Sequence, residues 1–203
     1  MKINSPRATR VFLLVLVCLT ISFSSVQTFA QKTNLDKVCV SKEEMKLYEL
    51  INEYRKTKGL PSIPLSRSLT FVAQTHVRDL AANHPDKGSC NLHSWSDKGT
   101  WTACCYTPDH KQALCMWNKP KELTKYPGQG FEIAFMSTGN LTAESALNGW
   151  ENSSHHNAVM TNTDIWKTSK WNAIGVAIYN GYSVVWFGRE ADAETVVPIE
   201  CAE

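Results

Sequence analysis

Apolar residues recur every three or four positions in several stretches of the chain, which is the spacing of one face of a helix. The first stretch follows the capping-box pair Ser41 and Glu44 and ends at Gly59; its apolar positions are Met45, Tyr48, Ile51 and Tyr54. Another stretch follows Thr142, and its apolar positions are Ala143, Ala146, Leu147 and Trp150. Each stretch predicts one helix.

A further helix is predicted to begin at Ser66 or Ser68, after a connector that contains Pro61 and Pro64. Its apolar face consists of Leu69, Val72, Ala73, His76 and Leu80. An imidazole on such a face is more often a hydrogen-bonded core residue than a ligand. We therefore assign His76 to the core or its boundary.

The second half of the chain carries strand signals. Residues 174–179 and 182–187 are β-branched and aromatic, and they flank Asn180-Gly181, which is the strongest short signal of a β-hairpin. Residues 131–135 form a short apolar run interrupted only by Glu132. Helices followed by an antiparallel hairpin predict an α+β domain with helices packed on a sheet.

Residues 83–130 are rich in glycine, proline, cysteine and tryptophan and show little periodicity. A loop of this length in a compact domain is usually functional or cross-linked. Its tryptophans can form a small core or a ligand-stacking platform, and we favour the core. They are Trp95, Trp101 and Trp117.

The first 30 residues have the composition of a secretory signal. Lys2, Arg7 and Arg10 precede an apolar run over residues 11–23, and Ala30 precedes the expected cleavage site. Thirteen apolar residues span only about 20 Å as a helix, whereas a bilayer core is about 30 Å thick, so we expect no stable membrane span. The predicted organisation is a signal peptide over residues 1–30 and one domain over residues 31–203, exported to the extracellular space or the periplasm.

The charge balance changes once the signal is removed. The 203 residues carry 21 basic and 19 acidic side chains, and the three basic groups of the signal account for the positive balance. The remaining 173 residues hold 18 basic and 19 acidic groups, which argues against a nucleic-acid partner. With 43% hydrophobic and 20% charged residues, the composition is that of a globular domain, which we expect to be a monomer.

Cleavage would remove Cys18 and leave an even number of cysteines, which in an exported chain predicts disulfides. The remaining cysteines are Cys39, Cys90, Cys104, Cys105, Cys115 and Cys201. Four of them crowd between residues 90 and 115, so we expect at least one bridge within that loop. Cys39 and Cys201 flank the domain and can join its ends. A zinc knuckle is the alternative, but the chain has no Cys-x-x-Cys pair.

Three polar residues interrupt apolar or aromatic surroundings and are the candidates for chemistry: His93, Glu132 and His156. Burying the lone carboxylate of Glu132 within Phe-Glu-Ile-Ala-Phe is costly unless it is paired. Two imidazoles and a carboxylate can partner one another. They are also a ligand set for zinc that leaves a coordination position open. A purely structural pairing is the alternative.

An ordered series of short motifs runs through residues 45–190. The motifs are Leu50-Ile51-Asn52-Glu53-Tyr54-Arg55 with Gly59-Leu60 and Leu65, then Leu69 with Ala73, then Leu92-His93-Ser94, Phe131-Glu132-Ile133, Trp150-x-x-Ser153-x-x-His156-x-x-x-Met160, and the residues of the hairpin up to Gly188. Together they resemble the CAP superfamily of cysteine-rich secretory, antigen-five and plant pathogenesis-related proteins. The stretch that begins at Trp150 is similar to the bacterial form of that family.

The resemblance implies an α-β-α sandwich with a central antiparallel sheet. It also implies a surface cavity, lined by two histidines and acidic residues, that often holds a divalent metal such as zinc. By position, the cavity residues here are His93, Glu132 and His156. The animal and plant forms carry a second cavity glutamate where this chain has Ser153, so Glu144 or Glu151 would have to reach in. The segment between His93 and Glu132 is longer than usual, and this Cys/Trp-rich insertion, at about residues 95–128, would cover the cavity or form a new surface.

The leading interpretation is an exported binding protein rather than an enzyme. Zinc or another divalent cation would lie in the cavity, and the partner would be an extracellular protein, a glycan or a lipid. A peptidase-like or esterase-like hydrolase is the alternative. In one form, a metal held by the two histidines activates a bound water, and Glu132 is its base or a further ligand. In the other, Ser94 or Ser153 is a nucleophile beside a histidine and Glu132. A third interpretation is lipid or sterol carriage, which requires an apolar groove.

Overall fold

The computed structural model describes Met1, residues 35–194 and residues 199–201. The predicted signal peptide, apart from Met1, lies outside the described residues. Among the residues that the structure describes, no helix combines the length and the apolar character that a bilayer crossing needs.

A three-stranded antiparallel sheet forms the middle of the domain. Its strands, β2 (Gly130–Met136), β3 (Ala173–Tyr179) and β4 (Tyr182–Gly188), lie in the order β2-β4-β3. Strands β3 and β4 form the predicted hairpin, and Asn180 and Gly181 at its turn both have positive φ. Strand β2 pairs with β4, which places Glu132 opposite Trp186.

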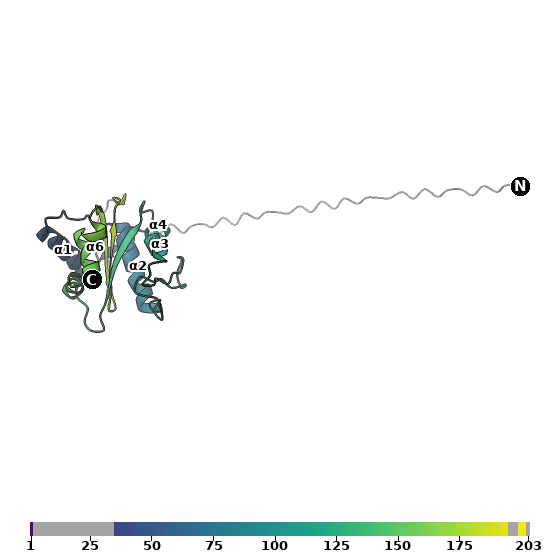
Figure 1. Cartoon of the computed structure of the whole chain (residues 1–203), viewed down its shortest axis with the longest axis horizontal. Coiled ribbons are helices and arrows are strands. Elements are labelled where there is room, and N and C mark those ends of the chain that lie inside the picture. The colour runs from purple at the N-terminus through teal and green to yellow at the C-terminus, as the bar shows by residue number, and fades with distance from the viewer. Residues whose placement is uncertain (2–34, 195–198, 202–203) are drawn as a thin grey trace. The chain divides into compact units, whose positions relative to one another are not determined.

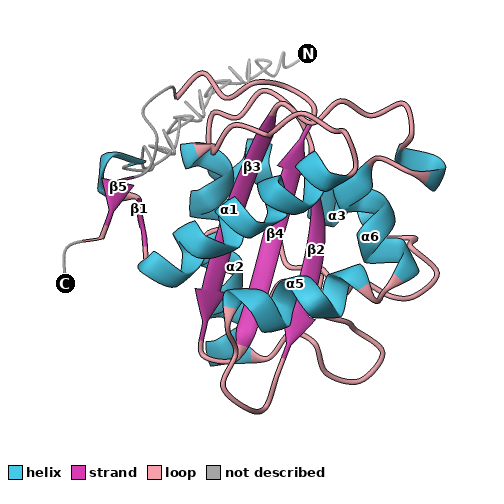
Figure 2. Cartoon of the chain, turned by 90° about the vertical axis from the view of Figure 1, so that its left-hand side faces the viewer, coloured by secondary structure: helices cyan, strands magenta, loops and turns pink. Residues whose placement is uncertain are grey.

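Helices cover both faces of this sheet. Figure 1 views the sheet edge-on, with α1 (Lys42–Thr57) and α6 (Ser154–Thr161) on one side and α2 (Arg67–Asn83), α3 (Ala113–Trp117) and α4 (Lys119–Leu123) on the other. In Figure 2, α1 and α5 (Ala143–Glu151) lie in front of the sheet and α2 lies behind it. This three-layer arrangement confirms the predicted α+β sandwich. The remaining elements are the 3-10 turns η1 (Leu35–Lys37) and η2 (Asp164–Trp166) and a parallel pair of short strands, β1 (Cys39–Val40) and β5 (Ile199–Glu200).

Alternation along the strands separates two hydrophobic cores. In β4, Trp186 packs in the core beneath α2, whereas Phe187 packs in the core beneath α1 and α5. In β2, Phe131 and Ile133 face the second core. Because successive side chains of a strand point to opposite faces, Glu132 faces α2 together with Trp186.

The helix ends follow the sequence signals. Ser41 and Glu44 form both hydrogen bonds of a capping box at the start of α1, and Gly59 follows its last turn with φ of 72°. Ser66 caps α2 by accepting a hydrogen bond from the Leu69 N–H. The five residues predicted for the apolar face of α2 are all buried, and among them His76 is fully buried.

The buried face of α1 differs from the predicted one. Met45, Tyr48 and Tyr54 are only half-buried, and the buried positions are Glu44, Leu47, Ile51, Asn52 and Arg55. The polar members are buried because the backbone satisfies them: Asn52 exchanges two hydrogen bonds with Ile63, and Arg55 donates to the carbonyl oxygens of Pro61 and Met160. The predicted face is therefore displaced by about one position and not wrong altogether, because Ile51 is fully buried and Tyr48 and Tyr54 pack against the edge of the core.

The cysteines follow the expectation in part. Disulfides join Cys39 to Cys201, at the two ends of the described domain, and Cys90 to Cys105, within the loop. The expectation that all six cysteines are bridged is wrong in this structure, because Cys104 and Cys115 carry free thiols. Cys104 pairs with Trp95 in a single antiparallel bridge, so adjacent Cys104 and Cys105 turn to opposite sides. Cys105 meets Cys90, whereas Cys104 is buried beside Cys115, and burial raises the pKa of its thiol.

Candidate functional site

The centre of the candidate site is Glu132, whose side chain is fully buried on the α2 side of the sheet. Its Oε1 lies 2.5 Å from Nδ1 of His76, and its Oε2 lies 2.8 Å from Nδ1 of His93. Burial by itself raises the pKa of the Glu132 carboxyl, but the two imidazoles outweigh burial and hold that pKa below its usual range. Glu132 is therefore an ionised carboxylate clamped between two rings.

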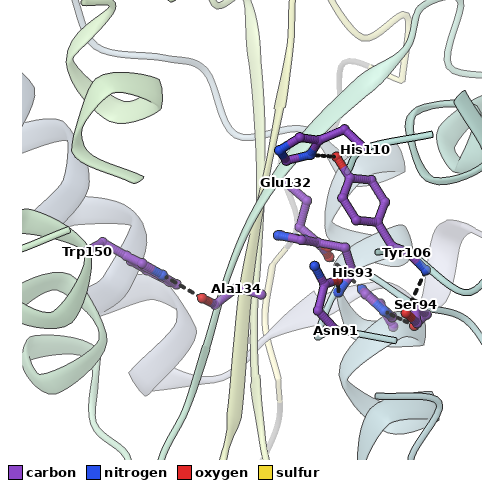
Figure 3. Close-up of polar contacts among 9 residues, drawn as sticks. Asn91, His93, Ser94, Tyr106, His110, Glu132, Ala134 and Trp150 are labelled. Atoms are coloured by element: carbon purple, nitrogen blue, oxygen red, sulfur yellow. Dashed lines mark hydrogen bonds and ion pairs between the residues drawn. The ribbon is translucent and has the colours of Figure 1, made fainter. Parts of the chain in front are cut away.

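His93 lies in a turn of the long loop that follows α2, ten residues beyond the last residue of that helix. Its backbone N–H donates to Oδ1 of Asn91, and the ring of Tyr106 packs edge-on against the imidazole at 5.2 Å between centroids (Figure 3). Because an ionised carboxylate only accepts hydrogen bonds, Nδ1 of His93 carries the proton and, in the neutral ring, Nε2 keeps its electron pair. The side chain is 19% exposed, so the ring is reachable from solvent.

His156 lies on α6 and is half-buried. Burial lowers its pKa to about 4, and electrostatic repulsion from His93 and His155 contributes to this lowering. His156 is therefore a neutral imidazole at neutral pH, close enough to His93 to interact with it electrostatically. Among the contacts of the described residues, none joins His156 directly to Glu132.

The positions of the His, Cys, Asp and Glu side chains show how far the described residues provide the expected metal site. In the described parts of the chain, no three His, Cys, Asp or Glu side chains are grouped so that they can hold a metal ion. Each carboxylate oxygen of Glu132 is already in contact with an imidazole nitrogen. Glu132 is thus hydrogen-bonded to one ring nitrogen each of His76 and His93.

The insertion supplies aromatic side chains that cover the two rings bound by Glu132. Trp95 stacks flat on His76, with 4.2 Å between centroids and 6° between planes. Tyr106 covers His93, and its hydroxyl is hydrogen-bonded to Nδ1 of His110, 2.9 Å away (Figure 3). Burial raises the pKa of Tyr106 and the charge of Glu132 raises it further, so the phenol stays neutral. Trp101 and Trp117 also pack against the cores rather than forming an open platform.

Comparison with known proteins settles the family. A family model described as "CAP: Cysteine-rich secretory protein family" matches residues 48–187, which is more than half of the chain. The chain belongs to the CAP family.

Two solved structures are similar to this CAP chain. One is an extracellular protein containing a SCP domain from Bacillus anthracis str. Ames, with a TM-score of 0.51 and 19% identity over 73% of this chain and 40% of that one. The other is a cysteine-rich secretory protein from Staphylococcus aureus subsp. aureus Mu50, with a TM-score of 0.48 and 16% identity over 80% of this chain and 41% of that one. This chain thus spans about two fifths of each, and the Bacillus protein supports the fold alone. No curated protein matches the chain.

The structure does not bring the other candidate residues of this CAP domain together around Glu132. These residues are Ser94, Ser153, Glu144 and Glu151. Ser94 is fully buried and its Oγ accepts from the Tyr106 N–H at 2.9 Å, so its hydroxyl is structural rather than an exposed nucleophile. Ser153 occupies the N-cap position of α6, but its side chain makes no capping hydrogen bond. Glu144 is exposed and pairs with Lys46. Glu151 is half-buried, and the hydrogen bond that the structure gives it is at its backbone carbonyl, from Asn157.

His76 is the member of the site that sequence reasoning assigned to the core. It is a satisfied core residue, as predicted, because both of its ring nitrogens are paired: Nδ1 with Glu132 and Nε2 with the carbonyl oxygen of Ser94, at 2.9 Å. The available signal was one ionisable residue in an apolar helix face and another, Glu132, in an apolar strand. Each of them is the partner that the other requires.

A groove of about 380 Å³ lies between α1 and α6, away from these contacts. Its lining residues are Tyr54, Lys58, Ser154, Asn157, Ala158, Thr161 and Thr163. None of the candidate histidines lines it. The lining is mostly polar, unlike the apolar groove that lipid carriage requires.

Proposed function

We propose that this CAP domain is an exported binding protein whose binding centre is the imidazole pair His93 and His156. The pair would hold one divalent transition-metal ion, such as zinc, whose open coordination positions take a donor atom from an extracellular partner. Export is supported by the basic and apolar character of residues 1–30 and by the two disulfides. It is also supported by the similarity to a Bacillus protein described as extracellular.

The observation that carries the proposal is the bond between Glu132 and Nδ1 of His93. Histidines that bind metals commonly donate their other ring N–H to a carboxylate, which fixes the tautomer and makes the free nitrogen a better donor. An imidazole that binds a metal must also be unprotonated. His156 meets this requirement, because its pKa of about 4 keeps the ring neutral at neutral pH. Both rings are partly accessible, whereas the third imidazole, His76, is fully buried.

Metal titration of purified protein tests the proposal. We expect one zinc ion per chain, and we expect His93→Ala and His156→Ala each to lower the affinity at least about tenfold, because each removes one of two ligands. His155→Ala is the matched control, since His155 is exposed and adjacent in sequence but outside the pair. Calorimetry with zinc chloride gives both the stoichiometry and the affinity.

Two results would contradict the proposal. One is zinc binding of equal strength in wild type and in the double variant that lacks His93 and His156. The other is an equal loss of affinity in the His155 control, which would show that exposed histidines in general bind the ion.

A further inference from the structure

We propose that the groove between α1 and α6 binds a uronic acid residue of an extracellular saccharide, a ligand with several hydroxyl groups and one carboxylate. The two helices lie on the same side of the sheet (Figure 1). The volume of the groove, about 380 Å³, is within the range of about 300–1,000 Å³ that is usual for small-molecule sites. This proposal goes beyond the metal-binding role of the histidine pair and does not depend on it.

One face of α6 forms a wall of the groove. Its lining residues recur at the three- and four-residue spacing that places side chains on one side of a helix. They are Ser154, Asn157, Ala158 and Thr161. His156 of the same helix is not a lining residue. A ligand in the groove therefore binds to a different part of the surface from a metal at the histidine pair.

The hydroxyl proton of Tyr54 is already used inside the groove. Tyr54 donates it to Oδ1 of Asn157 at 3.2 Å, and Nδ2 of Asn157 donates to the backbone carbonyl oxygen of Glu151 at 3.1 Å. Because the second bond fixes the orientation of the amide, the Tyr54 hydroxyl must be the donor of the first. The Tyr54 oxygen therefore offers a ligand only its lone pairs.

The two threonines of the groove present a second oxygen of this kind. Thr161 donates its proton to the backbone carbonyl oxygen of Asn157 at 2.7 Å, and its Oγ1 lies 3.2 Å from Oγ1 of Thr163. Since the single proton of Thr161 is used, Thr163 is the donor of the second bond. Thr163 is exposed, so its oxygen is an accessible acceptor. A ligand that pairs with both acceptors must supply hydroxyl protons of its own.

Lys58 supplies the positive charge of the groove. It is the one charged side chain among the described residues that line it, and its Nζ lies over the Tyr54 ring, 4.9 Å from the centroid. None of the ion pairs between described residues includes Lys58, so its ammonium is available to an anion. Buried Arg55 of the same helix donates to carbonyl oxygens, including those of Pro61 and Met160, rather than to a carboxylate. Its charge therefore adds to the positive potential of this region.

These groups together specify the class of ligand. A uronic acid matches them, because its hydroxyls donate to the oxygens of Tyr54 and Thr163 while its carboxylate pairs with Lys58. The exposed Ser154 hydroxyl makes no hydrogen bond among the described contacts and can bind a further sugar oxygen. A fatty acid would leave the two acceptor oxygens without donors. A neutral sugar would leave the ammonium without a charged partner.

Amide chemical shifts of nitrogen-15-labelled protein, with a metal chelator in the buffer, test the proposal. We expect glucuronic acid to shift the signals of Ser154, Asn157 and Thr163 until they saturate. Glucose, which lacks the carboxylate, should bind at least about tenfold more weakly, because it loses the charge-assisted contact with Lys58. Acetate, which has a carboxylate but no hydroxyl groups, should also bind at least about tenfold more weakly. The chelator prevents the carboxylates from binding through an ion at the histidine pair.

Two variants separate the charge from the hydroxyl contacts. Lys58→Gln should bring the affinity for glucuronic acid close to that for glucose. Thr163→Val should weaken the binding of both sugars and leave the ratio of their affinities unchanged, because it removes an acceptor and no charge. Lys56→Gln is the matched control, since Lys56 is an exposed lysine in the last turn of α1 that does not line the groove. It should change neither affinity.

Four results would overturn the proposal. Glucuronic acid that shifts none of the groove signals would exclude the site. Equal affinities for glucuronic acid and glucose would exclude the role of the charge, and equal affinities for glucuronic acid and acetate would exclude that of the hydroxyls. An equal loss in Lys56→Gln and Lys58→Gln would show a general attraction of anions to α1. Zinc titration of the histidine pair is a separate measurement, so failure of either proposal is recognised without the other.

Discussion

At the scale of single residues, the site depends on where protons reside at neutral pH. Glu132 is ionised because two imidazoles face it, and His156 is neutral because it is partly buried near other histidines. The two effects act in different pH ranges. The pKa of Glu132 is held below the ordinary glutamate range, so its contribution to stability is lost only under strongly acidic conditions. For His156, the free energy of unfolding already falls as the pH drops below about 6.5, the ordinary pKa of histidine.

Substitution of His156 should reveal that pH range. Its pKa is about 4 in the folded protein and about 6.5 when unfolded, so between these values the unfolded chain binds the extra proton and stability falls as the pH falls. We expect wild type to lose roughly 1 kcal/mol from this residue between pH 7.5 and pH 5, after allowing for its partial exposure. His156→Gln should lack this loss and His155→Gln should retain it, as measured by urea unfolding. Equal slopes in all three proteins would contradict the assignment.

Single residues also show how far the sequence could predict the site. Glu132 and His93 stand out because each interrupts an apolar or aromatic run, and the structure places them in contact. His76 gives the same kind of signal, but its partner depends on which face of the sheet Glu132 occupies. That face is set by the pairing of β2 with β4, in which Glu132 lies opposite Trp186, a residue far away in the sequence, and no local pattern encodes this pairing.

At the scale of elements, the site depends on a close approach between α2 and the sheet, because His76 comes from α2 and Glu132 from β2. Caps and the hairpin turn are local, and for that reason Ser41, Ser66 and Asn180-Gly181 predicted their elements correctly. The distance between a helix and a sheet is not local. It depends on small residues at the contact, and Gly175 in β3 is the one beneath the start of α2.

Gly175→Ala should therefore be strongly destabilising. A Cβ at this position would lie 2.1 Å from the carbonyl carbon of Leu69 and 2.3 Å from the backbone nitrogen of Thr70, which a helix backbone cannot avoid without moving. We expect a loss of about 3 kcal/mol or more in the free energy of unfolding. Gly139→Ala is the control, since the nearest atom to its added Cβ would be Ser137 Oγ at 3.8 Å. A change below about 0.5 kcal/mol in Gly175→Ala, by urea unfolding, would show that α2 can shift at little cost.

At the scale of the whole described domain, segments near its two ends are held together. Strands β1 and β5 pair in parallel, Cys39 is bonded to Cys201, and the Cys39 carbonyl accepts a hydrogen bond from Gln74 of α2 at 2.7 Å. The sequence suggested this bridge only from the flanking positions of the two cysteines. The sequence could not predict the pairing within the loop, because six cysteines allow about fifteen full connectivities. Which of the adjacent residues Cys104 and Cys105 meets Cys90 depends on the bridge between Cys104 and Trp95, which turns the two side chains to opposite sides.

The two disulfides should differ in their effect on stability because they close loops of different length. Cys39 and Cys201 are 162 positions apart, whereas Cys90 and Cys105 are 15 apart. If a bridge acts by restricting the unfolded chain, its loss costs about 5 kcal/mol for the long loop and about 3 kcal/mol for the short one. Urea unfolding of the Cys39→Ser/Cys201→Ser and Cys90→Ser/Cys105→Ser double variants measures both. Each variant, after removal of residues 1–30, should still show two thiols in denaturant, from Cys104 and Cys115. A larger loss for the short loop would mean that the Cys90–Cys105 bridge acts chiefly in the folded state, by holding Tyr106 over His93.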